Sequence, residues 1–490
     1  MCRARLARQR DAGPSPANTL ILQTQKRESA KRREGKMDLI LANGTIVTAH
    51  ESYDADIGIE DGVIKQIGHG LGPAGRTVDC SGKLLFPGGV DVHTHVEFEL
   101  MGQETADDFH SSTVAAACGG ITTICDYAFP EPGQSLQDCL VRWNQRGEKS
   151  VIDFGLHPTI FQPGEHTLSE MRDCVADGYT SFKIFMIGFA EFDKYAPQYL
   201  RCMEEAGKLG AMVNIHCEDQ CCISYMTQKL EEENNSNVRT FPDSRPRISE
   251  GLAARRALWM AHVADVPAYL VHLSCQEGLD ALNDARGRGQ TCYGETRPIY
   301  LHLSRERFNE EVDPERYVGW PPLREADQMD VMWQALDSNV LQTVATDHVG
   351  WNMKQKKASV TVDELLPGMS NLETVLPMLY SEGVREGRLS LNRFVDVSAT
   401  KPAKLMGMYP QKGTIAVGSD ADVMVFDPDK PVTIRQRDMH SKQDWELHEG
   451  FEVTGWPTMT ISRGDIIVED GKVSAEPGRG KLVKRRTYTT

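Results

Sequence analysis

The alternation of apolar and polar stretches along the chain predicts an α/β fold. Eight short apolar runs, rich in β-branched residues, are separated by stretches in which apolar positions recur with helical spacing. This alternation favours a parallel sheet, and eight such units favour a TIM-like (β/α)₈ barrel. In these barrels the residues that end each strand face the mouth, where chemistry occurs. The runs are LFPGGVDVHTH, ITTICDYAF, SVIDFGLHPTI, TSFKIFMIG, MVNIHCED, AYLVHLSC, TCYGETRP and LQTVATDH.

The stretches on either side of these runs have a different pattern. Short alternating apolar segments separated by Asn-Gly, Asp-Gly and Arg-Gly turns are typical of β-hairpins. We therefore expect residues 37–86 and 408–475 to form one small β-sandwich domain beside a catalytic barrel at residues 87–407. The C-terminal tail, residues 476–490, is expected to be either an arm that reaches a neighbouring subunit or a solvated basic segment.

The first 36 residues differ in kind from the rest of the chain. They carry ten Lys or Arg against three Asp or Glu, and they lack the apolar segment of a signal peptide. We expect residues 1–36 to be a basic N-terminal extension that is either disordered or the result of a start codon upstream of Met37. A transit segment or an interaction tail is the open alternative.

Composition narrows the choice of partner. The formal net charge of −16 argues against nucleic acid, because phosphate binding requires a basic surface. Since no apolar stretch reaches the length of about 18 residues that a membrane span needs, we expect no membrane association. The 12 cysteines include no C-x-x-C pair, and a chain of this length does not depend on disulfides, which favours reduced thiols and a cytoplasmic location.

The first apolar run ends in two histidines, His93 and His95, separated by one residue. Alternate side chains of a strand point to the same side, so these two imidazoles can bind one metal ion together. A pair of this kind is weak support on its own. Its place at a strand end, after the turn Pro87-Gly88-Gly89, strengthens the prediction.

Four further strand ends supply Lys183, His216, His272 and Asp347. Taken singly, either histidine fits a satisfied core position, and Asp347 fits the cap of a following helix. Together with the histidine pair, however, all these groups converge on one barrel mouth. The sequence therefore predicts a metal centre, in which Asp347 is also the candidate catalytic residue.

Lys183 is an unusual member of this set, because an ammonium group is a poor metal ligand. It stands between the apolar residues Phe182 and Ile184, where loss of hydration lowers the pKa of an amine. A neutral amine can react with CO₂ to give a carbamate, and the two oxygens of a carbamate can bridge two ions. This chemistry favours a binuclear site carrying a carboxylated Lys183.

From Met37 to its C-terminus the chain resembles the hydantoinase/dihydropyrimidinase family of the amidohydrolase superfamily. The resemblance is carried, in order, by DVHTH, SFKIFM, NIHCED, VHLSC, GET-x-P-x-Y, PPLR, ATDH, TKPAK and QKGTIAVGSDAD. It implies a homotetramer and two divalent ions, preferably zinc, although nitrogen and oxygen ligands also suit manganese or cobalt. It further implies the ligand set: a more buried ion on His93, His95 and Asp347, a more exposed ion on His216 and His272, and carboxylated Lys183 as the bridge.

The resemblance also implies a reaction, the opening of a ring amide in a small cyclic substrate. A hydroxide that bridges the two ions attacks the ring carbonyl, Asp347 passes a proton to the leaving nitrogen, and the product is an N-carbamoyl-type acid. Allantoinase, dihydroorotase and cyclic imide hydrolase activities use the same site and are the alternatives. A non-catalytic dihydropyrimidinase-like scaffold is disfavoured, because such scaffolds have lost metal ligands and this chain has all six.

Three substrate-facing positions depart from the family pattern. Gly188 stands where the family carries a tyrosine that assists the oxyanion, Arg297 replaces a small residue, and Pro367 replaces an asparagine. Arg297 pairs either with Glu295 or with a carboxylate or second carbonyl of the substrate. The second alternative, together with the space opened at Gly188, predicts a preference for polar or acidic ring substituents.

Three more polar residues of these runs are candidates for supporting roles. His348 follows Asp347, and a direct role is no better supported than none, because adjacent strand residues point to opposite sides. His157 is expected to be structural. Asp126 either supports the metal ligands or caps a loop.

Overall fold

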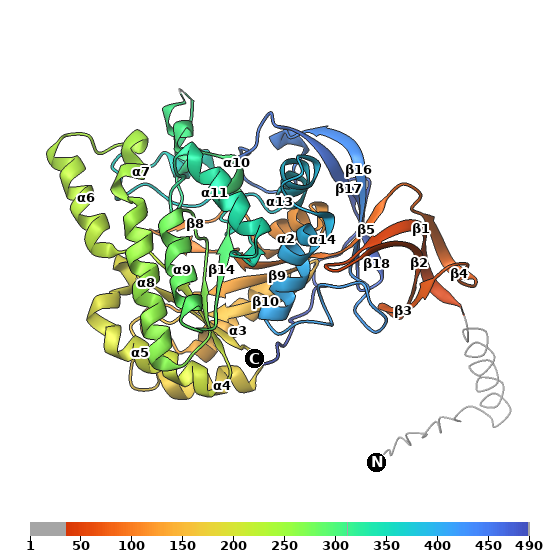
Figure 1. Cartoon of the computed structure of the whole chain (residues 1–490), viewed down its shortest axis with the longest axis horizontal. Coiled ribbons are helices and arrows are strands. Elements are labelled where there is room, and N and C mark those ends of the chain that lie inside the picture. Colours follow the sequence, from red (N-terminus) through yellow and green to blue (C-terminus); the bar gives the residue numbers. More distant parts are fainter. Residues whose placement is uncertain (1–35, 311, 489–490) are drawn as a thin grey trace, which may run out of the picture.

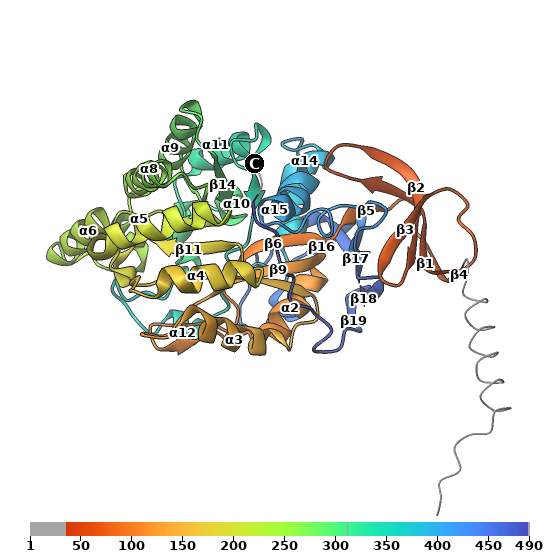
Figure 2. The same ribbon diagram turned by 90° about the horizontal axis from the view of Figure 1, so that it is seen from below.

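The computed structural model describes residues 36–310 and 312–488. The predicted N-terminal extension therefore lies outside the described residues, apart from Lys36. Figures 1 and 2 show a barrel surrounded by helices at one end of the molecule and a β domain, with strands β1 to β4, at the other.

Eight parallel strands form the barrel. They pair in the orders β10-β9-β6 and β11-β12-β13-β14-β15, and two further bridges, Thr159 with Lys183 and Thr94 with His348, join these sheets into a closed ring. The predicted TIM-like barrel is therefore confirmed. Its strands are β6 (Gly89–Thr94), β9 (Ile121–Ala128), β10 (Asp153–Pro158), β11 (Ser181–Phe185), β12 (Met212–His216), β13 (Ala268–Leu270), β14 (Cys292–Thr296) and β15 (Thr343–Val344).

Helix α3 shows how the helical pattern becomes a helix packed on the barrel. The side chain of Ser135 accepts a bond from the Asp138 N–H and caps its start, while Leu136, Leu140 and Trp143 are buried on one face. The α-helices are α2 (Phe109–Cys118), α3 (Leu136–Gly147), α4 (Thr167–Ala176), α5 (Phe192–Lys208), α6 (Gln220–Glu232), α7 (Phe241–Ser244), α8 (Arg247–Ala264), α9 (Gln276–Gly287), α10 (Ile299–His302), α11 (Ala326–Asp337), α12 (Met353–Lys356), α13 (Val375–Leu379), α14 (Leu391–Val395) and α15 (Lys401–Leu405).

Shorter helical turns lie in the loops between these elements. The 3₁₀ turns are η1 (Gly188–Ala190), η2 (Val238–Thr240), η3 (Arg305–Asn309), η4 (Pro314–Tyr317) and η7 (Gln436–Asp438). Two π-helical turns, η5 (Tyr380–Arg385) and η6 (Asp396–Thr400), follow α13 and α14. Of these turns, η1 lies nearest to the chemistry, because it carries Phe189 to the cavity at the barrel mouth.

Both ends of the chain contribute to the β domain, as predicted. Its strands form one continuous sheet in the order β19-β18-β17-β16-β5-β1-β2-β3, with β4 paired to β1. Strand β5 joins the two halves, since it lies parallel to β1 and antiparallel to β16. The strands are β1 (Met37–Val47), β2 (Ser52–Glu60), β3 (Val63–Gly68), β4 (Ala74–Asp79), β5 (Leu84–Pro87), β16 (Val423–Thr433), β17 (Glu452–Ser462), β18 (Asp465–Glu469) and β19 (Lys472–Val473); β7 (Glu99–Leu100) and β8 (Gln103–Glu104) form a separate hairpin.

The described part of the C-terminal tail packs against the chain's own barrel. Leu482 pairs with Phe154 at the start of β10. The guanidinium of Arg485, a residue only 4% exposed, donates to the Leu156 carbonyl at 2.6 Å and to Ser181 Oγ at 2.7 Å. These contacts hold the tail along the amino-terminal ends of the strands, opposite the barrel mouth, with Val483 and Arg485 buried and the basic side chains of Lys481, Lys484 and Arg486 exposed.

None of the helices within residues 36–310 and 312–488 combines the length and apolar character that crossing a membrane requires.

Candidate metal centre

A cavity of about 230 Å³ opens at the carboxyl ends of the barrel strands. It brings together five of the six predicted metal ligands, which come from different βα units: His95, Lys183, His216, His272 and Asp347. The sixth, His93, is fully buried just below it. The rest of the wall is largely aromatic, with Phe98, Phe129, Phe161, Phe185, Phe189 and Trp320.

His93, His95 and Asp347 converge at the deep end of this cavity. Asp347 Oδ1 lies 3.1 Å from His93 Nε2 and 3.0 Å from His95 Nε2. Among the described residues, the buried His93 Nε2 nevertheless makes no hydrogen bond of normal geometry. Two imidazole nitrogens and a carboxylate oxygen that face a common point form a donor set suited to a divalent ion such as zinc.

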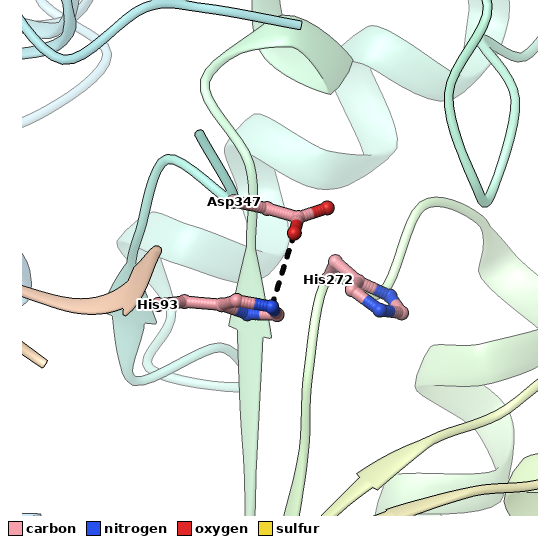
Figure 3. A group of neighbouring side chains, drawn as sticks. All are labelled: His93, His272 and Asp347. Atoms are coloured by element: carbon pink, nitrogen blue, oxygen red, sulfur yellow. Dashed lines mark ion pairs between the residues drawn. The ribbon is translucent and has the colours of Figure 1, made fainter. Parts of the chain in front are cut away.

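His272 completes the group that Figure 3 shows, facing His93 and Asp347. One donor atom from each of these three residues lies within 4.8 Å of the others. His216 lies next to His272, with ring centroids 4.5 Å apart. His272 and Asp347 both have left-handed backbone conformations, with φ of 43° and 48°, a region that His and Asp adopt more readily than most residues.

Lys183 projects from β11 into the same space. Its Nζ is buried 4.5 Å from the Tyr127 ring centroid and 4.7 Å from that of Phe185, with no hydrogen-bond partner in the part of the chain that the structure describes. Burial lowers the pKa of Lys183 to about 8, although Asp347 and Glu295 oppose this shift. An unpaired amine of this kind fits a carbamate better than a buried ammonium ion, so the residues present fit a binuclear centre.

Two buried glutamates contact two of the candidate metal ligands from outside the cavity. Glu295 Oε1 lies 2.7 Å from His93 Nδ1, and Glu218 Oε2 lies 2.8 Å from His216 Nε2. Burial by itself raises the pKa of the Glu218 carboxyl, but Arg245 and His216 outweigh this effect and lower the pKa to about 2. Carboxylates that bind the second nitrogen of a ligating histidine fix its orientation and tautomer.

Comparison with known proteins shows the family of the chain. The sequence model described as the amidohydrolase family matches residues 84–467, and that of the urease alpha-subunit N-terminal domain matches residues 18–81. A D-hydantoinase from Ralstonia pickettii is 42% identical over 92% of this chain and 100% of its own. The chain belongs to the amidohydrolase family.

Further relatives agree with the hydantoinase/dihydropyrimidinase branch of the family. A D-phenylhydantoinase from Escherichia coli is 34% identical over 92% of this chain and 99% of its own. The crystal structure of a dihydropyrimidinase from Brevibacillus agri superposes with a TM-score of 0.90 at 36% identity, covering 93% of this chain and 100% of that one. The predicted assignment to a family of metal-dependent hydrolases of cyclic amides is confirmed.

Arg297 departs both from the family pattern and from its expected pairing. Its Nη1 lies 3.1 Å from Asp347 Oδ2, and the side chain is 1% exposed. The predicted pairing with Glu295 is wrong, because the Glu295 carboxylate accepts from Tyr269 and the His272 backbone and contacts His93. Burial by itself raises the pKa of the Asp347 carboxyl, but the nearby Arg297 and His93 outweigh this effect. Together they hold the pKa well below its usual value.

The other two predicted substrate contacts differ from each other. Pro367 lines the cavity, as expected. Gly188 does not belong to the described lining, because it begins the turn η1 and donates its N–H to Gln220 Oε1 at 2.6 Å. This turn presents Phe189 to the cavity, so an aromatic side chain stands where the sequence indicated open space.

The remaining polar candidates have supporting positions. Asp126 accepts bonds from Thr94 Oγ1 and the Val96 N–H, both at 2.8 Å, and thereby fixes the segment that carries His93 and His95. His157 bonds Ser181 and the Val92 carbonyl inside the barrel, as expected of a structural residue. His348 is buried, with Nε2 at 3.7 Å from Asp107 Oδ2, and lies outside the cavity lining among the described residues.

Sequence reasoning missed four contributors: Glu218, Glu295 as a partner of His93, Arg245 and the aromatic wall. Both glutamates carried a usable signal. Glu218 stands two residues after His216, and Glu295 lies near the end of the seventh strand run, so each is an acidic group close to the carboxyl end of a barrel strand. Arg245 and Trp320 lie in loops, where strand-end logic does not apply.

Proposed function

We propose that this chain hydrolyses the ring amide of a hydantoin or dihydropyrimidine with two bound zinc ions. The inner ion is assigned to His93, His95 and Asp347, the outer ion to His216 and His272, and a carboxylated Lys183 to the bridge. The observation that carries the proposal is the convergence of these donors with an unpaired, buried lysine at one barrel mouth. When bound, two such ions supply a hydroxide nucleophile at neutral pH and stabilise charge on the substrate carbonyl.

The remaining chemistry falls to side chains of the protein. A water oxygen forms a bond to the ring carbonyl carbon, and the ring C–N bond breaks. Asp347 receives the proton that this water loses and delivers it to the leaving nitrogen, so the product is an open-chain acid with an N-carbamoyl group. Arg297 supports this role, since its contact at 3.1 Å orients the Asp347 carboxylate.

The aromatic wall favours substrates with an apolar ring substituent, and an aromatic one above all. Phe189 and Trp320 stack at 6.3 Å between centroids, and Phe185 packs against Phe189 at 5.1 Å. An aryl group between such rings gains about 1 kcal/mol beyond its burial. This site does not favour polar or acidic substituents, because the Arg297 guanidinium is bound to Asp347 and the aromatic wall is apolar.

Helix α8 supports a homo-oligomer, which we take to be a tetramer on the family resemblance. It exposes large apolar side chains at positions spaced by four, seven and four residues, which place them on one helical face. Their exposures are Ile248 52%, Leu252 44%, Trp259 50% and Val263 71%. A cytoplasmic location stays a prediction, since it depends on composition alone.

Purified enzyme tests the function directly. Metal analysis is expected to give about two zinc ions per chain, and dipicolinate treatment to abolish turnover until zinc is restored. Activity is measured on hydantoin, 5-phenylhydantoin, dihydrouracil, allantoin, dihydroorotate and glutarimide. We expect the highest kcat/KM for 5-phenylhydantoin. The proposal is contradicted if the chelator leaves the turnover rate unchanged, or if the enzyme hydrolyses only dihydroorotate or allantoin.

A further inference from the structure

Glu218 holds the metal-site histidine His216 from outside the cavity. Its Oε2 lies 2.8 Å from His216 Nε2, and both side chains are buried. An ionised carboxylate can only accept hydrogen bonds, so the histidine proton resides on Nε2. Nδ1 then keeps its lone pair, which a metal ion requires.

Arg245 binds the same carboxylate oxygen from the other side. Its Nη1 donates to Glu218 Oε2 at 2.8 Å, and the two side chains are 10% and 1% exposed. Removing one member of a buried ion pair is strongly destabilising, because the remaining charge is left unpaired. The position of Glu218, and with it that of His216, therefore depends on Arg245.

Arg245 in turn lies against the substrate-facing wall. Its guanidinium carbon stands 4.3 Å from the centroid of the Trp320 ring, within the range of a cation–π contact. Trp320 lines the cavity, and Phe189 stacks beside it with an interplanar angle of 21°. One continuous chain of contacts thus runs from the metal-site histidine through Glu218 and Arg245 to the wall.

The inner histidine has a different support. Glu295, which lies against His93 Nδ1, also accepts from the Tyr269 hydroxyl at 2.8 Å, and both Glu295 and Tyr269 are fully buried in the barrel. Its carboxylate is therefore fixed by the core and not by the cavity wall. This difference separates the two metal positions.

We propose that Glu218 and Arg245 are positioning residues that keep His216 in its metal-binding tautomer, and that Trp320 fixes them through its stack on Arg245. The wall that contacts the substrate thereby also sets the affinity of the outer metal position. This inference rests on the proposed binuclear function.

Zinc affinity tests the link without reference to turnover. The full-length chain is loaded with zinc and titrated with a chromophoric chelator, which resolves the two ions by their dissociation constants. Trp320→Ala is expected to weaken the outer zinc about 10-fold, whereas Trp320→Phe, which keeps an aromatic face under Arg245, retains most of the affinity. Phe189→Ala is the matched control, because it removes the neighbouring wall ring while Arg245 keeps its stack on Trp320.

Glu218 variants test the inner part of the chain of contacts. Glu218→Ala is expected to weaken the outer zinc about 10-fold to 100-fold and to leave the inner zinc bound. Glu218→Gln, whose amide oxygen can still accept from His216, is expected to fall between that variant and the wild type. Circular dichroism and the unfolding midpoint of the metal-free proteins report folding separately.

The possible failures are distinguishable. If wild-type protein binds no zinc, the proposed function fails. If wild type binds two ions and both Trp320→Ala and Glu218→Ala bind them equally well, the inference is overturned. If Trp320→Ala alters only KM, or if Phe189→Ala weakens zinc as much as Trp320→Ala does, the link through Arg245 is overturned and Trp320 acts only on the substrate.

Discussion

Arg297 and Asp347 form a buried ion pair in which only one of the two carboxylate oxygens of Asp347 faces the arginine. Oδ2 faces the Arg297 guanidinium at 3.1 Å, whereas Oδ1 faces the His93 and His95 imidazoles. Arg297 therefore fixes the rotation of the carboxylate that we propose as both metal ligand and proton carrier. Its contribution to the reaction passes through Asp347.

Replacing Arg297 with serine is expected to reduce kcat at least about 10-fold, because Asp347 loses the partner that orients it and balances its charge. The loss in kcat/KM should be equal, within a factor of about two, for neutral and acidic rings. Steady-state kinetics on 5-phenylhydantoin and on hydantoin-5-acetic acid measures this. Arg297→Lys serves as the matched variant, since it keeps the charge but not the planar fork. A KM increase confined to the acidic substrate would show that Arg297 binds the substituent directly.

Phe189→Ala is expected to raise KM for 5-phenylhydantoin about 5-fold to 10-fold and to leave KM for unsubstituted hydantoin unchanged. The variant removes a ring that packs against Phe185 and Trp320 at the cavity mouth, which is worth about 1 kcal/mol or slightly more to an aryl group. Tyr225→Ala, which removes an exposed aromatic residue outside the described cavity lining, is the control. Equal changes for both substrates would contradict an aryl-binding role.

The barrel and the approximate positions of the metal ligands could be predicted because they depend on local pattern. Strand ends in a parallel barrel meet at one mouth whatever the loops do, so His93, Lys183, His216 and Asp347 could be brought together from strand runs alone. The pairing of both chain ends into one β domain followed from short alternating apolar segments and the turn residues between them.

Side-chain direction and loop contacts could not be predicted in the same way. Arg297 and Glu295 are two residues apart on or near one strand, yet Arg297 turns toward Asp347, fifty residues later, because Glu295 is already bound to His93 and Tyr269. Gly188 was expected to open space, but the turn that it begins carries Phe189 to the cavity. Such outcomes depend on competition among partners that are distant in sequence.

Glu446 is expected to make stability depend on pH. Burial raises the pKa of this carboxyl from an ordinary 4.5 to about 8, even though the His448 N–H donates to it at 3.1 Å. Between these values the folded protein keeps a proton that the unfolded chain releases, so the free energy of unfolding falls as pH rises. At about 1.4 kcal/mol per pH unit, the loss amounts to at most about 5 kcal/mol across this window.

Glu446→Gln removes this titration and is expected to be progressively more stable than the wild type between pH 5 and pH 8. Urea midpoints of the metal-free proteins at several pH values give the difference. Glu449→Gln, a partly exposed neighbour, serves as the control. A difference between Glu446→Gln and the wild type that stays constant with pH would contradict a neutral, buried Glu446.

The double change Trp259→Glu and Val263→Glu on α8 is expected to dissociate the oligomer. Both side chains are at least half exposed on this face. Burying the introduced carboxylates against another subunit costs free energy, because they have no opposite charge to pair with there. Light scattering coupled to size exclusion reports the mass. Val360→Glu, at a loop residue that is 74% exposed, should leave the mass unchanged. A monomeric wild type, or a double variant of unaltered mass, would remove α8 from the interface.

The sheet that joins both ends of the chain also constrains how the protein emerges during synthesis. Strand β5 leads directly into the first barrel strand, and its antiparallel neighbour β16 lies more than three hundred residues later. On the ribosome, this edge of β5 has no native partner until the whole barrel has been translated. The nascent chain thus carries an open strand edge for most of its synthesis, at the place where chaperone binding or mispairing with another chain is easiest.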